Sequence, residues 1–187
     1  MIRVLIGSLA GGVVMFLVGF LFWATPLNKL AFSSASEQQT ANVQLAMANN
    51  LPHTGRYIVP DPETPGGTVL YGKGPVATVD YNAAGFSTQG GSWMLGGFIH
   101  EVVVAGLIGF SLLAVAGRVV DFESRARLVI GFSAAGSVLI TLSDPIWMHA
   151  DWGFAIYNLV ACMAMLIAPG LLIARWFLPR PVGATVH

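Results

Sequence analysis

The sequence has few charged residues and a single cysteine, and each shortage excludes a class of protein. Only 10% of the 187 residues are charged, against roughly 25% in an average soluble domain, so much of the surface is expected to face lipid. The formal net charge is zero, which gives no support for a nucleic-acid partner. Cys162 has no second cysteine to pair with, so a thiol oxidoreductase built on a cysteine pair is excluded.

Hydrophobic residues make up 55% of the chain and its mean hydropathy is +0.71. A membrane-spanning helix needs roughly 20 predominantly apolar residues. Four runs qualify, and none contains Lys or Arg: Val4–Ala24, Trp93–Gly117, Leu128–Trp147 and Phe154–Ala174. The first run could instead be a signal peptide cut near residues 33–35, but it is longer than the roughly 7–15 apolar residues of such a segment.

We therefore predict an all-α integral membrane protein with four transmembrane helices and a small α+β insertion between the first two. The predicted parts are a first helix in residues 1–25, an extracytoplasmic unit in 26–92, and a three-helix region with a short tail in 93–187. Phosphate-binding Walker loops and the nucleophile elbow of hydrolases are both absent from the sequence.

The basic residues predict the orientation, because short cytoplasmic loops are enriched in Lys and Arg. Arg3 precedes the first helix, three arginines occupy residues 118–127, and Arg175 and Arg180 follow the last helix. The loop between the third and fourth helices has no basic residue. Both termini are therefore predicted to be cytoplasmic, in a bacterial inner membrane.

The insertion carries local signals for both helix and strand. Residues 34–37 have the pattern of a capping box and predict a helix through about Asn49. A short strand is predicted at Arg56–Val59, and a hairpin is predicted from Thr68–Tyr71 and Val76–Tyr81. Three such strands bury little core, so we expect the unit to lean on the bundle or on a partner.

Two patterns predict helix packing. Gly7 and Gly11 form a GxxxG motif, which favours close backbone packing within the bundle and leaves an oligomer interface as the alternative. Polar residues at helical spacing predict a seam between the third and fourth helices that acts as hydrogen-bond glue, with a solute path as the alternative. The seam residues are Ser133, Ser137, Thr141, Asn158 and Cys162.

A third pattern is the one place where chemistry could occur. Five titratable residues fall at one depth near the outer boundary: His100, Glu101, Asp144, His149 and Asp151. Imidazole and carboxylate groups are ordinary ligands for a divalent metal such as zinc, with His100, His149 and Asp144 as the candidates. They also suit a proton relay. The favoured interpretation is simple pairing of half-buried charges, with the metal or relay site as the alternative. His100 and Glu101 are adjacent, so only one of them can face a shared centre.

Three functions remain open. The first is a non-catalytic accessory, scaffold or assembly subunit of a larger inner-membrane complex, which binds other membrane subunits or copies of itself and needs no cofactor. The second is a small transporter or a metal- or proton-handling protein that uses the outer cluster. The third is a membrane enzyme acting on a lipid-phase substrate such as a quinone, which predicts a cavity near His100.

Overall fold

The computed structural model describes residues 1–87 and 91–179. The remaining positions, 88–90 and 180–187, lie outside the described residues and include Arg180 and most of the predicted cytoplasmic tail. The chain divides into two compact units, one formed by Met1–Ser33 with Gly91–His187 and the other by Ser34–Gly90. We call the first the helical unit and the second the insertion.

Four helices of the helical unit are long and apolar enough to cross a membrane, which indicates a multi-pass membrane protein. They are α1 (Ile2–Trp23), α4 (Ser92–Val115), the continuous stretch Phe122–Trp147, and α7 (Trp152–Trp176). At a rise of about 1.5 Å per residue each exceeds the roughly 30 Å hydrocarbon core of a bilayer. A short 3₁₀ helix, η1 (Pro26–Leu30), follows α1, and Pro26, which cannot continue an α-helix, lies at this break.

The third predicted helix differs from the sequence prediction at both ends. It begins at Phe122 rather than Leu128, because the Asp121 carboxylate accepts a hydrogen bond from the Ser124 N–H and caps the first turn. It is also divided into α5 (Phe122–Thr141) and α6 (Ser143–Trp147). Pro145 explains the division, since it has no N–H to donate and its ring would collide with the carbonyl of Thr141 in an unbroken helix.

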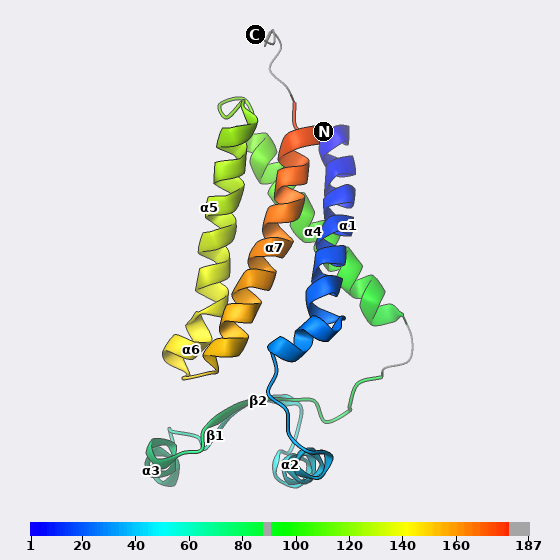
Figure 1. The fold of residues 1–187 in the computed structure, drawn as a ribbon. Helices are drawn as coiled ribbons and strands as arrows, with labels where there is room; N and C mark the ends of the chain where they lie inside the picture. The colour runs from blue at the N-terminus through cyan, green and yellow to red at the C-terminus, as the bar shows by residue number, and fades with distance from the viewer. Residues whose placement is uncertain (88–90, 180–187) are drawn as a thin grey trace. The chain divides into compact units, whose positions relative to one another are not determined.

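α7 lies between α1 and α5, and α4 packs mainly on α1 (Figure 1). Close approach to α4 depends on Gly12, where an added Cβ would lie 2.8 Å from the Cα of Val102. The buried apolar core runs through all four long helices and comprises Val4, Ala105, Leu112, Val129, Ile173, Ala174 and Leu178.

The insertion contains α2 (Glu37–Asn50), β1 (Gly55–Val59), α3 (Pro65–Lys73) and β2 (Ala77–Tyr81). The predicted helix near residue 36 is confirmed, although Ser36 and Gln39 form the capping box. The two strands pair antiparallel, with Gly55 opposite Tyr81 and Val59 opposite Ala77.

The predicted strand at Thr68–Tyr71 is wrong, because those residues belong to α3. The Thr64 hydroxyl accepts a hydrogen bond from the Gly67 N–H, and Pro65 occupies the first helical turn. This start signal outweighs the β propensity of Val69, Leu70 and Tyr71. Gly67 is required here, since any Cβ would collide with the backbone carbonyl of Asp61.

Candidate functional site

Glu101 is the ionisable residue that α4 turns toward the interior of the helical unit. It lies one helical turn before Ala105, which is fully buried, so the two side chains share a face. The Glu101 side chain is 14% exposed, whereas the neighbouring His100 side chain is 71% exposed. Adjacent side chains on a helix point about 100° apart, so Glu101 can face the interior while His100 faces outward. The His100 Nδ1 lies 3.6 Å from the Glu101 Oε1, a contact that carries charge attraction when the imidazole is protonated.

The Glu101 side chain lines a cavity of about 310 Å³ between the last turns of α1 and the first turns of α4. Glu101 is the ionisable residue in its wall. The other large side chains of the wall are aromatic or thioether groups: Phe16, Phe20, Trp23, Trp93, Met94 and Met165. Glycines 19 and 97 complete the wall and leave space for an occupant. We call this space the Glu101 cavity.

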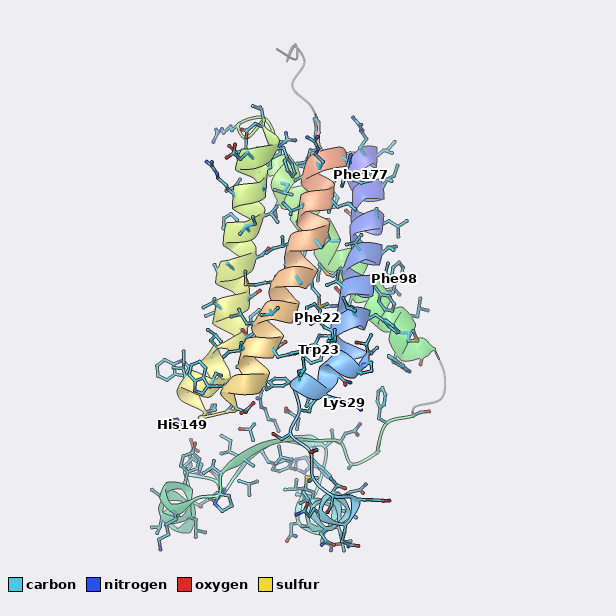
Figure 2. All side chains as sticks on the ribbon, in the orientation of Figure 1. Phe22, Trp23, Lys29, Phe98, His149 and Phe177 are labelled. Atoms are coloured by element: carbon cyan, nitrogen blue, oxygen red, sulfur yellow. The ribbon has the colours of Figure 1, made fainter. Side chains whose placement is uncertain are left out.

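Aromatic contacts hold the end of α1 against its neighbours around this cavity. Phe16 packs edge-to-face on Phe98 of α4, with ring centroids 5.8 Å apart. Trp23 packs the same way on Tyr157 of α7 at 5.4 Å, and the Tyr157 hydroxyl donates to the Phe22 carbonyl. Figure 2 shows Phe22 and Trp23 where α1 approaches α7, and Phe98 on α4 beside α1. The walls of the Glu101 cavity are therefore fixed by packing rather than by loops.

The other three members of the predicted outer cluster are Asp144 in α6, His149 in the turn that follows, and Asp151 at the N-terminal cap of α7. The Asp151 carboxylate accepts a hydrogen bond from the Phe154 N–H at 2.6 Å and caps α7. His149, labelled in Figure 2, occupies the turn with a positive φ of 53°. The Asp144 backbone carbonyl accepts from Met148 N–H at 2.8 Å. Asp151 and Asp144 thus accept hydrogen bonds at helix ends, and His149 lies in the turn between the two helices.

The structure does not bring the five cluster residues together. Within residues 1–87 and 91–179, the ion pairs and hydrogen bonds join His100 to Glu101 and none joins either of them to Asp144, His149 or Asp151. The physical reason is the order of the helices, because α4 packs on α1 and α7 whereas α6 packs on α5 and α7. An equal predicted depth in the membrane therefore does not place these residues on the same side of the helical unit.

The predicted metal ligands His100, His149 and Asp144 are not grouped around one centre. In the described part of the chain, no group of three or more His, Cys, Asp or Glu side chains could hold a metal ion. His100 and Asp144 belong to helices that do not pack along one another.

The predicted polar seam separates into two stripes. Ser133, Ser137 and Thr141 are buried on α5, and the Thr141 hydroxyl donates to the Ser137 carbonyl at 2.8 Å. The Ser137 hydroxyl is buried without a hydrogen-bond partner. On α7, the Cys162 thiol lies 3.5 Å from Asn158 Oδ1. Across the described residues, no side-chain hydrogen bond joins the α5 stripe to the α7 stripe.

The reason is the direction of the α7 stripe. Asn158 and Cys162 share a helical face with Met165, Pro169 and Ile173, because these positions recur at intervals of three or four. Met165 lies against Gly19 of α1, and Pro169 and Ile173 lie against Gly11. The α7 stripe thus faces α1 and α4 instead of α5.

Gly7 and Gly11 lie at contacts inside the chain. An added Cβ on Gly7 would collide with the side chain of Phe177, which Figure 2 labels beside the first turns of α1. On Gly11 it would lie 3.1–3.3 Å from Ile173, Ala105 and Pro169. The motif therefore lets α1 approach α7 and α4 closely.

Sequence reasoning missed a structural role for Arg125, which it used to assign orientation. This residue is 4% exposed. Its Nε donates to the Val119 carbonyl at 2.8 Å, and its Nη2 donates to Ala116 at 3.4 Å and to Pro179 at 3.1 Å. The guanidinium thus ties the chain segments that follow α4 and α7 to the start of α5. Four-residue spacing was the available signal, since Arg125 continues the stripe of Val129, Ser133 and Ser137.

No protein-family model, curated protein or solved structure matches this chain.

Proposed function

We propose that this chain is a non-catalytic accessory, scaffold or assembly subunit of a larger membrane complex. The observation that carries the proposal is the insertion, which lacks a core of its own. Gly67 is its buried residue within positions 34–87. Large apolar side chains remain exposed on it, among them Val43 (58%), Leu45 (62%), Val69 (56%), Leu70 (56%) and Phe86 (71%).

Exposed apolar side chains at this density favour a binding surface. Burial of apolar area stabilises a protein by about 25 cal/mol per Å², and a unit with almost none must gain it from a partner. Contiguous apolar patches on folded proteins commonly mark interaction sites. A partner that covers α2 and α3 would supply the burial that the insertion lacks.

A second support comes from the helical unit. α4 and α5 enclose an apolar groove of about 570 Å³, lined mainly by aliphatic and aromatic side chains with hydroxyls at Ser111 and Ser133. Small hydroxyl side chains are common at contacts between transmembrane helices, where they form interhelical hydrogen bonds. The groove therefore fits a helix of a membrane-embedded partner, either another subunit or a second copy of this chain.

We propose a bacterial inner membrane as the location, with cytoplasmic termini and an extracytoplasmic insertion. The support is the positive-inside pattern of the arginines near the ends of the apolar helices. Protease added from outside should cut the insertion near Pro60–Gly67 and spare residues 118–127 in intact spheroplasts. Cleavage between residues 118 and 127 in sealed spheroplasts would show that the orientation is the opposite of the one proposed.

Purification through mild detergent tests the role itself. The tagged chain should retain other membrane proteins, or further copies of itself, at constant stoichiometry. The double change of Val69 and Leu70 to Glu should release the partner, because it places charge on the exposed apolar face of α3. Lys73→Glu is the matched control, since it changes charge on the same helix without removing apolar surface. A wild-type chain that purifies as a monomer and alone would overturn the proposal.

A further inference from the structure

The Glu101 carboxylate lacks a permanent cationic partner. Among the described residues, the basic group beside it is the His100 imidazole at 3.6 Å, and no Lys or Arg side chain forms an ion pair with it. The side chain is nonetheless 14% exposed within apolar surroundings. An ionised carboxylate in such a place is costly unless a positive charge accompanies it, and intramembrane carboxylates therefore commonly mark functional sites.

The walls of the Glu101 cavity have the chemistry that attracts organic cations. The faces of Trp and Phe rings carry negative potential, and a cation within about 6 Å of a ring centroid is attracted to it. Four aromatic side chains line the cavity, including Trp23 from α1 and Trp93 from α4. The thioethers of Met94 and Met165 add polarisable surface that adapts to the shape of a ligand.

We propose that the Glu101 cavity binds a small hydrophobic organic cation, with the positive charge held by the Glu101 carboxylate and the apolar substituents packed among the aromatic rings. The site would add a ligand to this protein independently of its role in a complex. Its volume of about 310 Å³ falls at the lower end of the roughly 300–1,000 Å³ typical of small-molecule pockets.

The donor set favours an organic cation over a metal ion. A bound calcium or zinc ion requires several oxygen, nitrogen or sulfur ligands around one centre. Glu101 is the carboxylate of the cavity wall, and His100, whose side chain is 71% exposed, is not part of that wall. A neutral lipid chain would suit the aromatic walls but would leave the carboxylate without a partner.

Benzyltrimethylammonium is a suitable probe, because it joins one positive charge to one aromatic ring. The full-length chain in lipid nanodiscs should bind the tritiated probe saturably, at one site per chain. Neopentylbenzene is its neutral counterpart, in which carbon replaces the nitrogen, and it should not compete. Glu101→Gln should weaken binding at least tenfold, whereas Glu63→Gln, which removes an exposed carboxylate of the insertion, should leave binding unchanged.

A second variant tests the cavity without changing its charge. Gly97 lines the space, and an added Cβ there would meet only Phe16, at 3.9 Å. Gly97→Leu should therefore fill the cavity and abolish binding while the helical circular dichroism remains that of the wild type. Absence of saturable binding, equal binding by Glu101→Gln, or equal competition by neopentylbenzene would each overturn the proposal.

Discussion

Arg125 offers the sharpest test of how the helical unit is held together. Its guanidinium makes two short hydrogen bonds, at 2.8 Å to Val119 and 3.1 Å to Pro179, and a longer one at 3.4 Å to Ala116. A hydrogen bond to a charged group contributes about 1.5–3 kcal/mol, so the two short bonds contribute about 3–6 kcal/mol before any cost is subtracted. Removing Arg125 also removes the cost of burying a cation, which offsets part of that gain.

We therefore expect Arg125→Ala to lower the free energy of unfolding by about 2–4 kcal/mol. Arg127→Ala is the matched control two residues away, because Arg127 is exposed and forms an i,i+4 ion pair with Glu123. Such a surface pair contributes about 0.3–0.5 kcal/mol. Arg125→Lys should fall between the two, since one ammonium cannot reproduce the planar set of donors.

Reversible unfolding in mixed micelles, followed by circular dichroism, measures all three variants on one scale. The reasoning fails if Arg125→Ala and Arg127→Ala destabilise the protein to within about 1 kcal/mol of each other. In that case water or lipid headgroups would satisfy the helix-end carbonyls as well as the guanidinium does.

Three further predictions use the same unfolding assay. Gly12→Ala should destabilise the protein by about 1–3 kcal/mol through overpacking against α4. The control Gly131→Ala, at a glycine that faces open space, should be neutral or stabilise the protein by up to about 1 kcal/mol. Equal effects of the two changes would refute the close contact at Gly12. Hydrogen bonds from Ser124 hold the pKa of Asp121 below its ordinary value of 3.8. The ionised carboxylate therefore stabilises the folded protein above pH 3.8, and this contribution is lost as pH falls through the lower folded-state pKa. Asp121→Asn keeps the cap and should show a smaller acid-induced loss of stability, and an unchanged loss would contradict this. His149→Gly should stabilise by about 1 kcal/mol, because a positive φ is costly for any residue with a Cβ; destabilisation would show that the imidazole makes a contribution larger than the backbone cost.

Hydropathy predicted the four long helices because length and apolarity alone determine whether a segment can span a bilayer. Side-chain caps and one proline explain the differences at the ends of the third predicted helix. Asp121 starts α5 a full turn and more before the apolar run begins, and Pro145 divides α5 from α6. In the insertion, the Thr64–Pro65 start signal for α3 is present in the sequence, but the β-branched and aromatic residues after it favour a strand.

The candidate site was harder to predict because depth and lateral position are independent quantities. Counting residues from the arginines gives the depth of His100, Glu101 and Asp144, but no residue count gives the order of helices around the bundle. That order depends on which helices approach closely, and glycines mark the close contacts here: Gly12 admits α4 against α1, and Gly11 admits α7. With α4 packed on α1 and α7 and not on α6, Glu101 faces an aromatic cavity instead of a carboxylate cluster. The positions of glycines therefore indicate which helices are neighbours, whereas polar residues at the same predicted depth do not.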